Sequence, residues 1–314
     1  MITKTEKAHG TAVGGMFSRF KKQIWLQAMV IPGIIFTIIF CYIPMFGVII
    51  AFKEYNFTDG ILRSPWVGLQ HFKSFLTAPN LGNVLYNTIG ISFLKSVVGF
   101  PIPIIFALLL NELKNLRFKK MVQSISYLPH FISYVVIVGF VGKIFASNGV
   151  INDALMALKI IKEPILFLGE KNYFWGIVAG TSIWKGMGYG SILYLAAITG
   201  VDQSMYESAT LDGAGKLRKV ISITLPSITP IIVIQLIFMV NGILNAGFDD
   251  ILLLQNSMVM ERAEVLDTYT YKMGLQNGRY SYATAVGLLM SVVRIVLVLG
   301  TNWVAKKTTE QSMW

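Results

Sequence analysis

Long runs of apolar residues dominate the chain and determine its predicted secondary structure. An α-helix rises about 1.5 Å per residue, so roughly 20 apolar residues cross the hydrocarbon core of a bilayer. Six runs reach that length: residues 24–52, 87–110, 121–145, 173–199, 228–254 and 281–305. The pattern predicts an all-α polytopic membrane protein with six transmembrane helices. They form one domain over residues 24–305, with polar tails at 1–23 and 306–314.

The first apolar run follows Lys21 and Lys22, as the hydrophobic segment of a secretory signal would. It is longer than the roughly 7–15 residues of such a segment and lacks a cleavage site of small residues. We therefore expect an uncleaved membrane span.

Composition supports the membrane assignment. The chain is 54% hydrophobic and only 14% charged, against roughly 25% charged residues in a soluble domain. This excludes a disordered chain and argues against a soluble enzyme. The net charge of +11 is unevenly placed: with the N-terminus inside, the inner segments hold 14 basic and six acidic residues, the outer segments ten and eight. Basic residues favour the cytoplasmic side, so both termini are predicted to be cytoplasmic, and no nucleic-acid surface is expected.

The residue types needed for catalysis or metal binding are scarce. Cys41 is the only cysteine, and the histidines, His9, His71 and His130, have no metal-ligand spacing. Lys216 is followed by Leu217, so Gly215–Lys216 is not part of a phosphate-binding loop. The glycines of the fourth run, residues 186, 188 and 190, are predicted to let helices pack closely. We expect neither catalysis nor a cofactor in this chain.

A polar segment over residues 200–226 separates the fourth and fifth runs. The pattern predicts a short helix over 203–211 with Asp202 as its N-cap, a break at the glycines that follow, and a second helical stretch over 216–223. Pro226 is predicted to end this unit before the next span. The composition alone leaves open an amphipathic loop lying on lipid headgroups.

The residues of this segment also carry a family resemblance. Glu-Ser-Ala-Thr-Leu-Asp-Gly-Ala at 207–214, followed by Ile-Thr-Leu-Pro at 223–226, resembles the EAA loop of binding-protein-dependent ABC importer permeases. The coupling positions it implies are Glu207, Ser208, Ala209, Asp212, Gly213, Ala214, Leu225 and Pro226. Ser208 replaces the first alanine of the family pattern, and Val220 stands where an aromatic residue is common.

Residues 127–133, 149–152, 194–197, 247–249 and 301–303 are similar to oligosaccharide permeases of the lipoprotein/polysaccharide transport type. The resemblance implies a type I importer fold in a bacterial plasma membrane. Its implied partners are a second homologous permease, an ABC ATPase dimer that binds the ATP, an extracellular solute-binding lipoprotein and an oligosaccharide substrate. By position, Glu207 is expected to pair with a basic residue in a cleft of the ATPase, with residues 212–214 forming the bend.

Polar residues within the predicted spans are candidates for the substrate pathway, because burying them in lipid is costly. Asn241, Asn245 and Asp249 recur at i, i+4 and i+8, which predicts one helical face. Planar polar groups and aromatic rings suit sugar hydroxyls and C–H faces. The pathway candidates are Trp184, Lys185, Tyr189, Asn241, Asn245, Phe248 and Asp249. Hydrogen bonds between helices are the alternative role for each.

Lys185 and Asn241 are expected at similar depth, and Lys185 is a candidate selector of acidic sugars. Lys95 and Asp250 are expected to reach the membrane interface, and Arg294 to pair with a structural partner. The outer segments 53–86 and 146–172 are large enough to contact a solute-binding protein. An importer for a polyol phosphate or a peptide remains an alternative function. A membrane-embedded enzyme or a channel fits less well, because neither convergent titratable groups nor a repeated pore motif is present.

Overall fold

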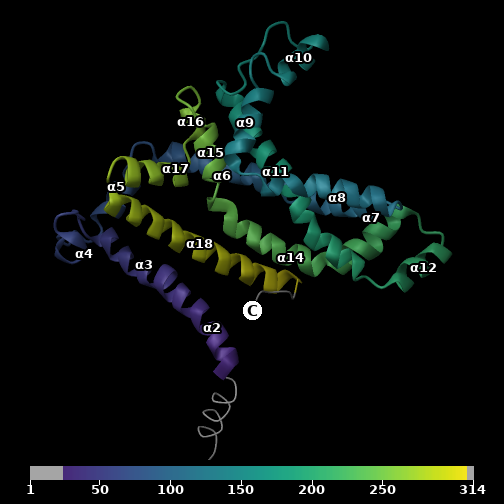
Figure 1. Ribbon diagram of the computed structural model, residues 1–314, viewed down its shortest axis with the longest axis horizontal. Helices are drawn as coiled ribbons and strands as arrows, with labels where there is room; N and C mark the ends of the chain where they lie inside the picture. The colour runs from purple at the N-terminus through teal and green to yellow at the C-terminus, as the bar shows by residue number, and fades with distance from the viewer. Residues whose placement is uncertain (1–23, 310–314) are drawn as a thin grey trace, which may run out of the picture.

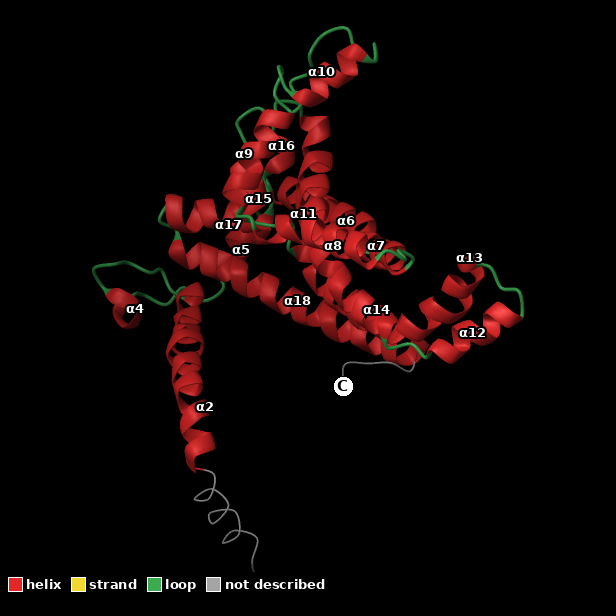
Figure 2. Ribbon diagram, turned by 45° about the vertical axis from the view of Figure 1, so that its right-hand side comes forward, coloured by secondary structure: helices red, strands yellow, loops and turns green. Residues whose placement is uncertain are grey.

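The computed structural model describes residues 24–309, and its regular structure is helical (Figures 1 and 2). Within that range the only β-type pairing is an isolated bridge between Lys53 and Trp66. Four of the described helices are long and apolar enough to cross a membrane, and a bent helix pair makes a fifth. The expected all-α membrane fold is confirmed, whereas the structure does not establish the count of six apolar helices. The predicted tail 1–23 and residues 310–314 lie outside the described range.

The first predicted span is a continuous helical rod over Ile24–Phe52. It consists of α2 (Ile24–Thr37), a π-helical turn, α3 (Ile43–Met45) and the 3-10 helix η2 (Phe46–Phe52). In both views α2 stands apart from the other helices, and the rod contacts α18 (Tyr280–Thr309) through η2. Its surface is apolar and almost wholly exposed, as expected of a helix surrounded by lipid.

The second span is a helix of 31 residues, formed by α6 (Leu81–Gly99) and α7 (Pro101–Asn111). The fourth is α11 (Lys171–Thr199), which packs against α6, α7, α8 (Leu116–Phe131) and α14 (Leu225–Asn241). α11 is not among the helices apolar enough to cross a membrane on composition alone. Its packing against several helices accounts for this, because helix contacts in a membrane favour small residues such as glycine, serine and threonine, which lower the mean hydropathy.

The third predicted span is broken, so the expectation of one helix over residues 121–145 was wrong. α8 (Leu116–Phe131) and α9 (Tyr134–Ile144) meet at 104°. Ile132 is extended, and the Ser133 hydroxyl accepts a hydrogen bond from the Val136 N–H, so Ser133 is the N-cap of α9. A new helix therefore begins at Ser133 instead of α8 continuing.

The fifth span begins earlier and ends earlier than the apolar run at 228–254 predicted. One helix runs over Lys216–Leu244, through α13 (Lys216–Lys219), the π-helix η3 (Val220–Thr224), α14 (Leu225–Asn241) and the 3-10 turn η4 (Gly242–Leu244). Pro226 does not end a helix, contrary to expectation. It follows the π-turn directly, where the backbone hydrogen-bond pattern is already irregular and tolerates a missing N–H.

After Leu244 the chain leaves the helix, and α15 (Asp249–Leu254) begins on the far side of the break. Asn241, Asn245 and Asp249 therefore do not share one helical face, and that expectation was wrong. The periodicity argument failed because it assumed an unbroken helix across residues 242–248. Gly247 has a φ of +102°, a conformation that favours glycine and that a straight helix cannot include.

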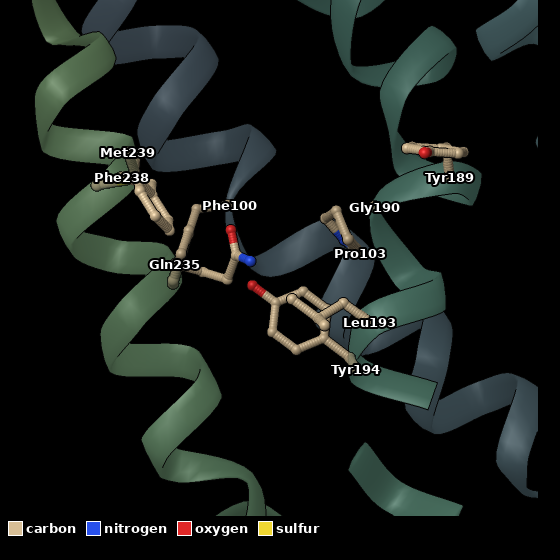
Figure 3. A pocket seen from close by; sticks show the side chains of 9 residues that line it. All are labelled: Phe100, Pro103, Tyr189, Gly190, Leu193, Tyr194, Gln235, Phe238 and Met239. Carbon is tan, nitrogen blue, oxygen red and sulfur yellow. The ribbon is translucent and has the colours of Figure 1, made fainter. Parts of the chain in front are cut away.

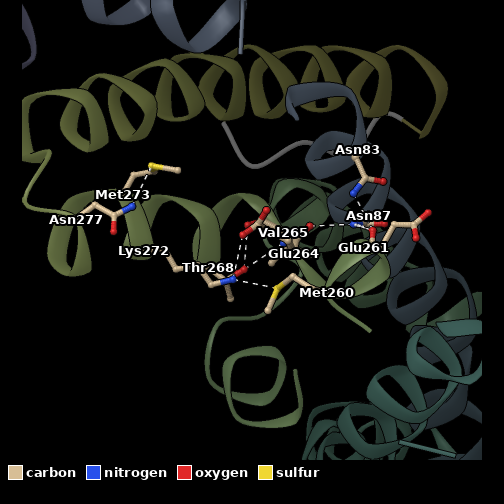
Figure 4. A network of polar contacts seen from close by, with 10 residues as sticks. All are labelled: Asn83, Asn87, Met260, Glu261, Glu264, Val265, Thr268, Lys272, Met273 and Asn277. Atoms are coloured by element: carbon tan, nitrogen blue, oxygen red, sulfur yellow. Dashed lines mark hydrogen bonds and ion pairs between the residues drawn. The ribbon is translucent and has the colours of Figure 1, made fainter. Parts of the chain in front are cut away.

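Short helices make up the parts of the molecule that lie away from α12 (Gln203–Leu211), at the left and top of Figure 1. They are α4 (Gly60–Arg63), α5 (Gln70–Leu76), α10 (Val150–Ala157), α16 (Met260–Ala263), α17 (Leu266–Tyr271) and the π-helix η5 (Lys272–Gln276). Asn87 of α6 donates hydrogen bonds to the carbonyls of Glu261 and Glu264, and the Lys272 ammonium pairs with Glu264 at 3.0 Å (Figure 4). These contacts hold the segment before α18 against α6.

Candidate functional site

The polar segment between α11 and α14 forms two helices that project from one end of the molecule (Figure 2). α12 begins at Asp202, whose carboxylate accepts a hydrogen bond from the Ser204 N–H at 2.9 Å, as the sequence predicted. This hydrogen bond lowers the pKa of Asp202. Gly213 makes the bend before α13 with a φ of +75°, which favours glycine over other residues.

Three side-chain contacts hold this helix pair: two join it to the rest of the chain, and the third joins α13 to α12. Lys216 forms an ion pair at 3.2 Å with Glu112, which follows α7. The Tyr206 and Thr224 hydroxyls hydrogen-bond at 2.9 Å, and the Lys219 ammonium donates to the Thr210 hydroxyl at 2.7 Å. The pair of helices is thus tied to α7 and to the start of α14.

The predicted coupling positions lie together on this pair of helices, apart from Leu225 and Pro226 at the start of α14. Among them Glu207, Ser208, Asp212 and Gly213 are exposed, as is Pro226, whereas Ala209, Ala214 and Leu225 are half-buried. Beside them the side chain of Leu211 is 90% exposed and that of Leu217 is 72% exposed. Large exposed apolar side chains next to polar ones are typical of a surface that another protein covers.

A cavity of about 550 Å³ opens between the junction of α6 and α7, the middle of α11 and the upper part of α14 (Figure 3). Its lining residues are Phe100, Pro103, Tyr189, Gly190, Leu193, Tyr194, Gln235, Phe238 and Met239. The Gln235 amide and the Tyr194 hydroxyl point toward one another across it. The sequence predicted only Tyr189 of this set. The signal for Gln235 was available, since it is a polar residue in the middle of an apolar run.

Trp184, Lys185 and Tyr189 lie on α11, as predicted. Trp184 and Tyr189 are each 45% exposed. Tyr189 stacks on His130 at 3.9 Å between ring centroids, with the planes nearly parallel. His130 therefore belongs to the same region, although the sequence offered no reason to place it there.

Lys185 points at the break between α8 and α9. Its ammonium donates hydrogen bonds to the carbonyls of Pro129 (3.1 Å), His130 (2.7 Å) and Ile132 (2.6 Å). It also lies 5.0 Å from the centre of the Tyr134 ring. The last carbonyls of a helix lack partners within that helix, and a cation there is favourable. Lys185 thus binds the backbone at the helix break.

The remaining pathway candidates lie around the second break. Asn245 and Asp249 are exposed, and half-buried Phe248 packs edge-on against Tyr271 with ring centroids 5.1 Å apart. Asn241 is the last residue of α14, and its side chain lies outside the described part of the structure. The structure therefore does not test the expected meeting of Asn241 with Lys185.

The other intramembrane charges also lie at this second break. Lys95 pairs with Asp250 at 2.5 Å, and the Asp250 side chain is only 2% exposed, so these residues do not extend to an interface as expected. The Arg294 guanidinium donates to the Leu244 carbonyl at 3.2 Å and lies 3.6 Å from the Asp267 carboxylate. The expectation that Arg294 has a structural partner is confirmed.

Comparison with known proteins identifies the family. The family described as "Binding-protein-dependent transport system inner membrane component" matches residues 99–310, which is more than half of the chain. The chain belongs to this family. It is therefore a multi-pass membrane component of a binding-protein-dependent transport system, and the resemblance inferred from residues 207–226 is confirmed.

Individual relatives narrow the assignment. The chain is 42% identical over 295 residues to Protein LplB of Bacillus subtilis (strain 168), covering 94% of this chain and 92% of that protein. It is 39% identical to the polygalacturonan/rhamnogalacturonan transport system permease protein YteP of the same organism, covering 99% and 100%.

A solved structure agrees with these relatives. A bacterial ABC transporter involved in the import of the acidic polysaccharide alginate contains a chain with 38% identity and a TM-score of 0.86, covering 94% of this chain and 99% of that chain. The protein is a permease subunit of a carbohydrate ABC importer and not an enzyme.

Proposed function

We propose that this permease carries an acidic, uronate-containing oligosaccharide and is driven by a separate ATPase that binds α12 and α13. The exposed apolar side chains of α12 and α13 are the observation that supports the proposed contact with the ATPase. The substrate part is supported by the relatives: YteP is named for polygalacturonan and rhamnogalacturonan, and the similar solved transporter for alginate.

The proposed assembly has four kinds of component, of which this permease is one. A second permease completes the pathway, an ATPase dimer binds and hydrolyses the ATP, and an extracellular solute-binding protein delivers the sugar. A similar solved transporter is described in complex with a periplasmic protein that holds an alginate pentasaccharide, which supports the last partner. The inner segments together hold 14 basic and six acidic residues, and this excess supports a cytoplasmic position for the end with α12 and α13 and for both termini.

The mechanism follows from the continuity of the helix over Lys216–Leu244. ATP-driven closure of the ATPase would move α12 and α13 as a rigid unit, and α14 would carry that movement to the second break. Such rigid-body rearrangement between two states is how transporters alternate access to a central site. Trp184, Tyr189, Asn245, Phe248 and Asp249 would contact the passing sugar.

Substituting the exposed coupling residues tests the ATPase contact. Glu207→Ala removes a carboxylate without disturbing the helix, and Gly213→Pro cannot adopt the positive φ of the bend. We expect both variants to insert into the membrane normally while ATP-driven uptake is abolished. Ser204→Ala, on the first turn of the same helix, is the matched control because its side chain makes none of the three anchoring contacts. Normal uptake in both coupling variants would reject the proposed contact.

Substrate class is tested with the assembled importer in proteoliposomes. We expect uptake of uronate oligosaccharides, supplied with the solute-binding protein, to exceed that of neutral oligosaccharides of the same length. Preferential uptake of the neutral sugars would reject the acidic class and leave the permease assignment unaffected.

A further inference from the structure

The non-helical segment between α14 and α15 is held by a lysine from another helix. The Lys95 ammonium of α6 donates a hydrogen bond to the Ala246 carbonyl at 2.5 Å and pairs with the Asp250 carboxylate at 2.5 Å. Ala246 is fully buried. One cation thus binds a backbone carbonyl in the break and the first turn of the next helix.

The backbone around Lys95 is fitted closely to it. An added Cβ at Gly247 would overlap the Asp250 carboxylate and lie 2.8 Å from the Lys95 ammonium. The Asp250 carboxylate also accepts a hydrogen bond from the Ile251 N–H at 3.0 Å, so it binds a free backbone N–H in the first turn of α15 as well. Glycine at 247 is therefore required by both its φ and its neighbours.

Ala246 is buried within the protein, so water does not reach its carbonyl, and a carbonyl released from a helix in such a place needs another partner. In transporters with broken helices, a bound ion often occupies such a position. Here a covalently attached ammonium does so, and the same arrangement recurs where Lys185 binds the carbonyls at the end of α8.

We propose that Lys95 is a positioning residue of the translocation pathway: its ammonium fixes the segment 245–248 so that Asn245, Phe248 and Asp249 are presented to the substrate. This deepens the proposed function and rests on it for the identity of the pathway. Lys95 acts through this segment, because its ammonium is engaged by the Ala246 carbonyl and the Asp250 carboxylate.

Thiol labelling measures the position of the segment independently of transport. Cys41 is the only cysteine, so Cys41→Ala gives a background into which Asn245→Cys is introduced, with Leu62→Cys in a remote exposed helix as the control. The assembled importer is treated with a membrane-impermeant maleimide. We expect Lys95→Met to change the labelling rate at position 245 about ten-fold, the effect of losing a charged hydrogen bond, and to leave position 62 unchanged.

Two further variants separate positioning from simple neutralisation of a buried charge. Lys95→Met leaves the Asp250 carboxylate unpaired, whereas Lys95→Met/Asp250→Ala removes both charges and adds no hydrogen-bond donor. If Lys95 only neutralises Asp250, the double variant recovers the parent labelling rate and the parent KM for uptake. The positioning role predicts that the double variant recovers neither the labelling rate nor the KM, because the Ala246 carbonyl still lacks its donor. It also predicts that Lys95→Arg recovers the parent labelling rate and the parent KM.

Unchanged labelling at position 245 in Lys95→Met would overturn the proposal, as would equal changes at positions 245 and 62, which would show general unfolding. If the parent importer carries no oligosaccharide, the proposed function fails, and labelling still decides whether Lys95 holds the segment.

Discussion

At the scale of single residues, the basic side chains inside the membrane-spanning region act on the backbone. Lys185 binds the carbonyls at the end of α8, Arg294 binds the Leu244 carbonyl just before the second break, and Lys95 binds the Ala246 carbonyl within it. A charge inside a membrane is costly unless it is paired. A carbonyl released from a helix needs a hydrogen-bond donor, so the cation and the carbonyls at each helix break stabilise one another.

The position of Lys185 leads to a prediction about charge selectivity. Its ammonium is engaged by three carbonyls, so we expect Lys185→Met to reduce uptake of uronate and neutral oligosaccharides by the same factor, about ten-fold for the loss of charged hydrogen bonds. Initial uptake rates of matched sugars measure this, with Lys143→Met, an exposed lysine at the end of α9, as control. A selective loss of uronate uptake would instead support Lys185 as the selector of acidic sugars.

Asp249, unlike Lys185, is expected to affect the selectivity between uronate and neutral oligosaccharides. It is exposed beside the break, and a carboxylate there repels an acidic sugar. We expect Asp249→Asn to raise uronate uptake relative to neutral uptake a few-fold, because like charges 4 Å apart in water repel by about 1 kcal/mol. Competition between the two sugars in one uptake assay measures the ratio. A ratio that stays constant would place Asp249 away from the substrate.

The sequence predicted which residue types matter but not what they touch. Lys185, Asn245 and Asp249 were selected because polar groups are costly in lipid, and all three lie at the helix breaks. Their partners could not be predicted, because the carbonyls that Lys185 binds are more than 50 positions away in the chain and become free only once α8 is broken.

At the scale of elements, close helix contacts depend on particular glycines. Among the three glycines predicted to pack helices, an added Cβ at Gly188 would overlap the Ser126 carbonyl of α8, and one at Gly190 would lie 3.3 Å from Pro103. At Gly186 it would meet nothing within 4 Å. The packing interpretation is confirmed for Gly188 and Gly190 and is wrong for Gly186.

This difference gives a matched pair of variants. We expect Gly188→Ala to lower the thermal stability of the protein, because backbone must move to admit the methyl group and overpacking costs about 1–3 kcal/mol. Gly186→Ala should be neutral or slightly stabilising, since alanine favours helix over glycine. Thermal unfolding in detergent measures both. Equal stability of the two variants would contradict the close contact between α8 and α11.

Apolar runs predicted where helices lie better than where they end. The first span was placed at Ile24–Phe52, the bounds that the structure has. The break before Ser133 was missed because the flanking residues are apolar on both sides. The start at Lys216 was missed because residues 216–219 are polar, and a helix that extends beyond the membrane carries no hydrophobic signal there.

At the scale of the whole molecule, one helix joins the two candidate sites. The helix over Lys216–Leu244 has 29 residues and is therefore about 43 Å long. It begins at the bend formed with α12 and ends at the segment that Lys95 holds. A stiff helix transmits displacement along its axis, so movement of α12 and α13 reaches Asn245 without a chain of side-chain rearrangements.

Making the middle of this helix flexible should prevent movement at its α13 end from reaching its other end at Leu244. Ile232→Gly/Val233→Gly places two flexible residues in α14, each costing about 1 kcal/mol relative to alanine, while Ile232→Ala/Val233→Ala removes the same side chains and keeps the helix stiff. We expect nucleotide to change maleimide labelling of Asn245→Cys in the alanine pair and to have no such effect in the glycine pair, although the glycine importer still hydrolyses ATP. A nucleotide response retained by the glycine pair would show that the movement reaches the break through α11 or α18, and α14 would then not be the coupling element.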